Sequence, residues 1–154
     1  MRKILTALAA VLISLTLAAP APAAAIVPVR GLGYVQGRGW TPAPDGDLVG
    51  AYGVIGTTGQ SRELQAYLVF GADLLVSAKV YGQGWTEPSP YGVSVVGKRI
   101  VGIQVTSTDP KYRAVVDCHV QDVGWVYVGD GQKCGAAGSV KRLEAVRVRL
   151  VTNG

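Results

Sequence analysis

The sequence predicts an all-β protein made of three repeated strand–turn–strand units. Short runs rich in Val, Leu, Ile and Tyr alternate with polar residues, and this is the period of a half-buried strand. The 21 Gly and 8 Pro interrupt the chain too often for long helices. The chain also repeats itself, because "GTTGQSRELQAYLV" at 56–69 returns as "GAAGSVKRLEAVRV" at 135–148.

The N-terminal residues have the composition of a signal peptide. "MRK" gives a positive start, an apolar core follows, and "PAPAAA" supplies small residues. Cleavage after Ala25 or after Ala23 fits this pattern. The apolar run is short for a membrane span, and no second long apolar run follows it. We therefore expect residues 1–25 to be removed and residues 26–154 to form one secreted, extracellular domain without a membrane anchor.

The charged residues do not form the basic stripe of a nucleic-acid-binding protein. Arg2 and Lys3 of the leader contribute to the formal net charge of +5, and the other basic residues are scattered. Basic residues interleaved with aromatic ones would indicate a nucleic-acid surface. We expect no nucleic-acid partner.

Each unit carries a Gly-Trp pair before its last strand. The pair ends the segments "YVQGRGW", "KVYGQGW" and "HVQDVGW". The three units occupy residues 29–70, 74–107 and 112–151. The recurring residues, which we expect to have structural roles, are Gly39, Trp40, Gly84, Trp85, Gly124 and Trp125.

The tails after these pairs predict how the last strands are buried. Alternation in "RELQAYLVF" predicts two faces, one with Leu64, Ala66, Leu68 and Phe70 and the other with Glu63, Gln65 and Tyr67. "RLEAVRVRL" breaks this alternation, because Leu143 and Ala145 have one parity and Val146 has the other. A β-bulge, or two differently buried halves of one strand, would explain the break.

A unit of this size cannot bury a core by itself. Three units packed around a pseudo-threefold axis can do so together. The first interpretation is a β-prism-like domain, and the alternative is a β-trefoil. In both, the repeated tail is a strand that each unit contributes to a shared core.

The tryptophans have two interpretations. A residue that recurs in every unit can hold the fold by burying a large apolar area, and this is the interpretation that we favour. An exposed ring could instead stack on a sugar, with one site in each unit. The glycine before each Trp is expected to allow a backbone geometry or a close contact that a Cβ would obstruct.

Cys118 and Cys134 are the two cysteines, and an even count in an exported chain predicts a disulfide. Closing a loop of about 15 residues would stabilise the fold by about 3 kcal/mol. A metal site lacks ligands, because His119 is the one histidine and zinc requires four ligands. We expect no metal and no cofactor.

Nothing in the sequence indicates an enzyme. Asp117 and His119 would share a face of a strand, but no nucleophile elbow and no readable pair of carboxylates accompanies them. Tyr34 holds the place of His119 in the first unit, which favours a structural role for this position. "GTTGQS" lacks the Lys-Ser/Thr of a phosphate-binding loop, so a tight turn explains it better.

The third unit, with "HVQDVGW", "GAAGS" and "KRLEAVRVRL", resembles the clostridial hydrophobic W (ChW) repeat. The first unit keeps "VQGRGW" and "GTTGQSRELQA", whereas the second keeps only Gly92 of the Gly-rich turn. The resemblance implies an extracellular, non-enzymatic module in adhesion or protein interaction. In size and β-rich character, the chain is also similar to the small secreted adaptor subunits of umbrella-type bacterial toxin particles.

The start of the expected domain is a candidate partner-binding arm that consists of Ile26, Val27, Pro28 and Val29. It is either the first strand of its own domain or a strand that adds to a partner's sheet. Two Pro/Gly-rich loops, with Tyr52 and Tyr91, are further candidate contacts because loops carry function.

Two functions fit these features. The first is a protein–protein adaptor or structural subunit of a larger secreted assembly, whose partners are larger secreted proteins. The alternative is a lectin-like module for cell-wall or cell-surface glycan. A lectin should expose the same aromatic and polar residues in each unit, whereas an adaptor should concentrate its exposed apolar residues in one unique patch.

Overall fold

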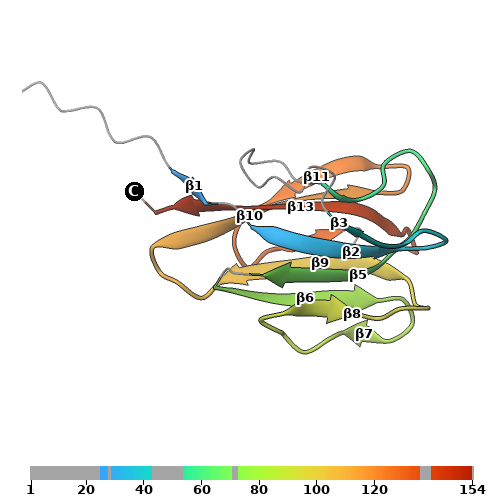
Figure 1. Cartoon of the computed structure of the whole chain (residues 1–154), viewed down its shortest axis with the longest axis horizontal. Helices are drawn as coiled ribbons and strands as arrows, with labels where there is room; N and C mark the ends of the chain where they lie inside the picture. The colour runs from blue at the N-terminus through green and yellow to red at the C-terminus, as the bar shows by residue number, and fades with distance from the viewer. Residues whose placement is uncertain (1–24, 28, 43–53, 71–72, 136–139, 154) are drawn as a thin grey trace, which may run out of the picture.

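The computed structural model is all-β, as predicted, and its strands form three antiparallel sheets (Figure 1). Among the described residues there is no helix, and so none long and apolar enough to cross a membrane. The structure describes residues 25–27, 29–42, 54–70, 73–135 and 140–153. The predicted signal peptide, Pro28 and Tyr52 lie outside this part of the chain.

Each sheet is built on two long antiparallel strands of one unit. The first sheet has the order β3 (Gly39–Pro42), β2 (Arg30–Val35), β5 (Leu64–Phe70), β8 (Gly92–Ser94). The second has the order β7 (Gly84–Trp85), β6 (Leu74–Val80), β9 (Ile100–Ser107), β12 (Lys133–Gly135). The third contains β11 (Gly124–Val128), β10 (Tyr112–Val120) and β13 (Leu143–Thr152), and β13 also pairs with β4 (Ile55–Gly56) and β1 (Ile26–Val27).

The same tight turn joins the first two strands of each unit. Its third residue has a positive φ, which a turn of type II requires: 71° at Gly37, 74° at Gly82 and 57° at Asp122. The Gly before each Trp also has a positive φ, and no atom lies within 4 Å of the place where its Cβ would be. These glycines therefore serve the backbone conformation and not a close contact.

A β-bulge interrupts the last strand of each unit. His119 pairs with Ala145 and Val120 pairs with Leu143, so Glu144 is the extra residue in β13. This confirms the bulge as the reason for the broken alternation in "RLEAVRVRL". The first two sheets have the same shift between Tyr34 and Val35 and between Lys79 and Val80.

The predicted faces of "RELQAYLVF" are wrong, because the bulge also reverses the alternation in β5. Leu64, Tyr67 and Val69 belong to the central hydrophobic cluster, whereas Ala66 is fully buried but outside that cluster, and Leu68 is half-buried. Complete burial raises the pKa of the Tyr67 phenol above its usual value. The side chain of Phe70 lies outside the described part of the structure.

Each sheet is completed by a short strand that belongs to a different unit. β4 follows β3 in the chain but pairs with β13; β8 follows β7 but pairs with β5; β12 follows β11 but pairs with β9. The three exchanges connect the three sheets in a closed cycle. Residues from all three sheets form the hydrophobic core.

The exchanged strands approach their neighbours closely at a glycine. Gly56 pairs with Ala145 and has φ 111°, and a Cβ at this residue would collide with the carbonyl oxygen of Glu144. Gly135 makes the equivalent pair with Gly102. Gly92 pairs with Leu68, two residues along from the equivalent position, so the second unit keeps a close-contact glycine in a different register.

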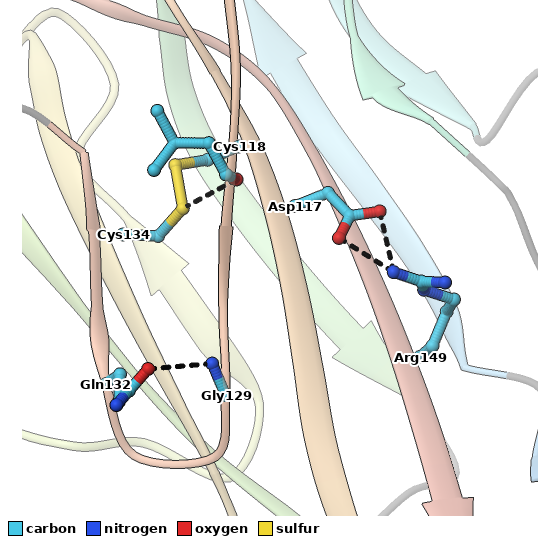
Figure 2. Close-up of a disulfide and its surroundings, with 7 residues drawn as sticks. Asp117, Cys118, Gly129, Gln132, Cys134 and Arg149 are labelled. Carbon is cyan, nitrogen blue, oxygen red and sulfur yellow. Dashed lines mark hydrogen bonds and ion pairs between the residues drawn. A yellow bond between two sulfur atoms is a disulfide. The ribbon is translucent and has the colours of Figure 1, made fainter.

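The predicted disulfide between Cys118 and Cys134 is present (Figure 2). Both cysteines are buried, on β10 and β12 respectively. The bond therefore joins the third sheet to an exchanged strand of the second sheet.

The N-terminal arm is a strand of its own domain. Ile26 pairs with Val151 and Val27 pairs with Leu150, at the edge of β13. Val27 and Val29 pack against the hydrophobic core. Of the two interpretations of the arm, the structure shows the intramolecular one.

We predict that Gly56→Ala lowers the free energy of unfolding by about 2–5 kcal/mol, because it adds a steric collision to an unfavourable φ. Gly59→Ala is the matched control, since Gly59 also has a positive φ (68°) but has no atom within 4 Å of its Cβ position. Gly59→Ala should lower the free energy of unfolding by about 1–2 kcal/mol. Urea unfolding measures both, and equal losses would show that the exchanged strand tolerates a side chain.

Candidate interaction surfaces

The three tryptophans lie on the outer faces of the sheets and not in the core. Each pairs with the residue before the buried valine of its hairpin: Tyr34 with Trp40, Lys79 with Trp85, His119 with Trp125. Trp40 is 47% exposed and the other two are half-buried. The expectation that these rings are core residues is wrong, because the alternation of the strand turns them outward.

A small residue on the last strand lies under each of these pairs. The tip of the Trp85 ring is 3.5 Å from the place where a Cβ of Gly102 would be. The same register puts Ala66 opposite Tyr34 and Ala145 opposite His119. The small residue that ends "LQA" (64–66), "IVG" (100–102) and "LEA" (143–145) is therefore in the position where a larger side chain would compete with the tryptophan.

Different side chains contact the three rings. The Trp125 ring receives the edge of His119 at 5.3 Å, and the Arg147 guanidinium lies 4.5 Å from its centroid. The Lys133 ammonium lies 5.0 Å from the centroid of Trp85. Trp40 makes an edge contact with Tyr34, whose centroid is 5.4 Å away. The repeated ring is thus placed in three chemically different surroundings.

Two buried carboxylates organise the charges of the third sheet. Arg149 donates to both oxygens of Asp117, at 2.8 and 3.0 Å (Figure 2). Arg147 lies 3.7 Å from the same carboxylate. Glu144 is ion-paired with Arg142 at 3.0 Å, and its second oxygen lies 3.1 Å from His119 Nδ1. Burying these carboxylates is tolerated because each one has a cationic partner. Within the described residues, no group of three or more His, Cys, Asp or Glu could hold a metal ion.

The exposed large apolar residues are not distributed equally among the units. Among the described residues they are Ile26, Trp40, Tyr81, Tyr91, Val96, Val123, Tyr127 and Val140. Four of these, Tyr81, Val96, Val123 and Val140, lie in the tight turns or just before a last strand. We call this region the hairpin end; it comprises residues 36–38, 60–63, 81–83, 96–99, 121–123 and 140–142. Figure 1 shows the β2–β3 turn at the right, opposite the C-terminus and β1.

Arg99 connects all three units at the hairpin end. Its Nε donates to Glu63 of the first unit at 2.7 Å, and its Nη1 donates to the Val140 carbonyl of the third at 3.3 Å. Its guanidinium also lies 5.6 Å from the ring centroid of Tyr81. One arginine of the second unit therefore links the first and third units at this end.

The sequence-predicted partner-binding residues that the structure describes lie on two different sheets and away from the hairpin end. Tyr91 is 74% exposed, but its carbonyl accepts from Val69 N–H near the far end of β5. Ile26 is 45% exposed beside the end of β13. Sequence reasoning missed the hairpin end, although a signal was present: Tyr81 and Val123 are apolar at turn positions where the first unit has Gln36 and Arg38.

These features define a small all-β protein with a disulfide. Residues 119–152, which include most of the third unit, match the family model described as "Clostridial hydrophobic W". This match supports the resemblance to the ChW repeat. Searches of curated proteins and of solved structures found no match.

We predict that Trp125→Ala costs more stability than Trp40→Ala. The Trp125 ring has two partners, His119 and Arg147, whereas Trp40 is half-exposed and contacts Tyr34. The expected losses are about 2 kcal/mol for Trp125→Ala and about 1 kcal/mol for Trp40→Ala. Chemical denaturation followed by circular dichroism measures both, and the reverse order would contradict the assignment of these contacts.

Proposed function

We propose that this chain is a secreted, non-enzymatic protein–protein interaction module, an adaptor or structural subunit of a larger extracellular assembly. The observation that carries the proposal is the unequal distribution of exposed apolar residues. Four of the eight lie at the hairpin end, on the second and third units alone. An adaptor needs one such patch, whereas a repeated ligand site needs the same residues in every unit.

The surroundings of the tryptophans favour the adaptor over a threefold lectin. A sugar that stacks on a ring needs an accessible face. Arg147 lies over Trp125 and Lys133 lies over Trp85, so cations of the chain itself occupy that space. Polar groups that would select a sugar also differ at the three rings.

The pairing of the strands supports a β-prism-like frame for this function. Three sheets of the same construction, each completed by a strand of another unit, give a rigid body with loops at its two ends. The disulfide supports an oxidising, non-cytoplasmic location, which fits the predicted signal peptide. A toxin particle is the kind of assembly to which the similarity with small adaptor subunits points.

A lectin is the second candidate, and Trp40 is the observation that favours it. Trp40 is 47% exposed, and its ring makes an edge contact with the ring of Tyr34. A single glycan site at Trp40 would leave the fold unchanged on Trp40→Ala while abolishing glycan binding.

One experiment separates the two functions. The full secreted chain is used as bait in culture supernatant of the producing cells, and the same preparation is applied to a glycan array. We expect one or two larger secreted proteins at fixed stoichiometry, no glycan ligand, and an unchanged result for Trp40→Ala. A glycan ligand that is lost in Trp40→Ala, together with no recovered protein, would replace the adaptor with the lectin.

A further inference from the structure

We propose that the hairpin end is a docking surface for an acidic surface of a partner protein. The inference rests on the proposed adaptor function and assigns that function to a particular face. It depends on three observations: exposed apolar side chains, an excess of basic groups around them, and a backbone that holds both in place.

The apolar part of the surface comes from residues that turns rarely expose. Tyr81 is 53% exposed, Val96 48%, Val123 54% and Val140 59%. They lie on the second and third units. At the equivalent positions the first unit has polar residues: Gln or Ser at three of them, and Arg38 in place of Val123. Exposed aliphatic and aromatic side chains gathered at one end are typical of a protein–protein contact.

The charged part of the surface is predominantly basic. Its basic residues are Arg38, Arg62, Lys98, Arg99, Lys141 and Arg142. Its acidic residues are Glu63 and Asp122, and a third acid, Glu144, lies just beyond it in β13. Two of these acids are already ion-paired within the chain, Glu63 with Arg99 at 2.7 Å and Glu144 with Arg142 at 3.0 Å. The exposed side chains of Arg38 and Lys98 attract an acidic partner, because complementary charge steers association and selects the partner.

The surface is preorganised by one hydrogen bond that recurs in the three units. The second residue of each tight turn donates its N–H to a carbonyl just before the last strand: Gln36 to Glu63 at 3.0 Å, Tyr81 to Arg99 at 2.9 Å and Gln121 to Arg142 at 3.1 Å. Lys98 Nζ also donates to Gln83 Oε1 at 3.0 Å, across the second unit. Side chains on a fixed backbone lose less freedom on binding.

The combination of apolar and basic side chains at the hairpin end favours an acidic protein over an anionic polysaccharide as the partner. A polyanion that binds through charge alone needs basic groups without apolar ones between them. Here valines and a tyrosine separate the basic residues, so carboxylates can bind the cations, and a partner that also has apolar side chains covers the rest of the surface. The partner chemistry that fits is therefore carboxylates surrounding an apolar patch.

The test uses a defined probe and two matched charge reversals. Full-length secreted protein, labelled with ¹⁵N, is titrated at low salt with poly-L-glutamate and separately with heparin. Arg38→Glu/Lys98→Glu reverses two exposed charges of the hairpin end. Lys111→Glu/Arg113→Glu reverses two exposed charges at the other end of the long strands and is the control.

We expect poly-L-glutamate to shift amide resonances of the hairpin end, with affinity at least tenfold weaker in Arg38→Glu/Lys98→Glu and unchanged in the control. Recovery of partner proteins from the supernatant should fall in the same variant and in Tyr81→Ser/Val123→Thr. Shifts elsewhere, an equal loss in the control, or binding of heparin without poly-L-glutamate would overturn the proposal.

The two proposals fail differently. If partners are recovered undiminished by both hairpin-end variants, the docking surface is wrong while the adaptor function stands. If the parent protein recovers no partner at all, the adaptor function fails, and the poly-L-glutamate titration alone decides whether this end binds acidic chains.

Discussion

The structure depends on the exchange of one short strand between units. The last strand of each unit has its own first strand on one side and, on the other, a strand from a different unit. Without that exchange every sheet would end in an unpaired strand in the middle of the molecule, and buried N–H and C=O groups would lose their partners. Cooperation between units is therefore imposed by backbone hydrogen bonding as well as by the shared core.

The exchange explains residues that appear unrelated in the sequence. Gly56 and Gly135 are needed because each exchanged strand passes against a neighbouring backbone. The bulge at Glu144 reverses the inward and outward alternation of side chains in the rest of β13. Val146 therefore faces the core, and Arg147 faces the Trp125 ring. The buried disulfide reinforces one of the three exchanges, because Cys134 lies on β12 and Cys118 on β10. The glycines thus serve contact between units, whereas the disulfide fixes an exchanged strand to its own unit.

The sequence predicted the all-β class and the disulfide, and it offered the bulge in β13 as one of two explanations for the broken alternation, because these depend on composition, cysteine count and alternation within one strand. It did not predict the exchange, since strand pairing between units leaves no periodic signal. It also placed the tryptophans in the core, because a Trp in every unit suggests burial, whereas the outward position follows only from the register of Trp125 with His119. The hairpin end was missed for the same reason: Arg99 of the second unit reaches the Val140 carbonyl of the third only after the units have assembled.

Native-state hydrogen exchange tests the central claim most directly, because it measures the opening free energy of individual hydrogen bonds. The amide of Thr57 donates to Glu144 at 3.0 Å and that of Val95 donates to Gln65 at 2.9 Å, and both bonds join different units. If the units are stable only together, these amides should open with the same free energy, within about 1 kcal/mol, as the amide of Val116 in the centre of β10. Opening of Thr57 and Val95 at a free energy several kcal/mol lower, while Val116 stays protected, would contradict the account and show that the exchanged strands are dispensable.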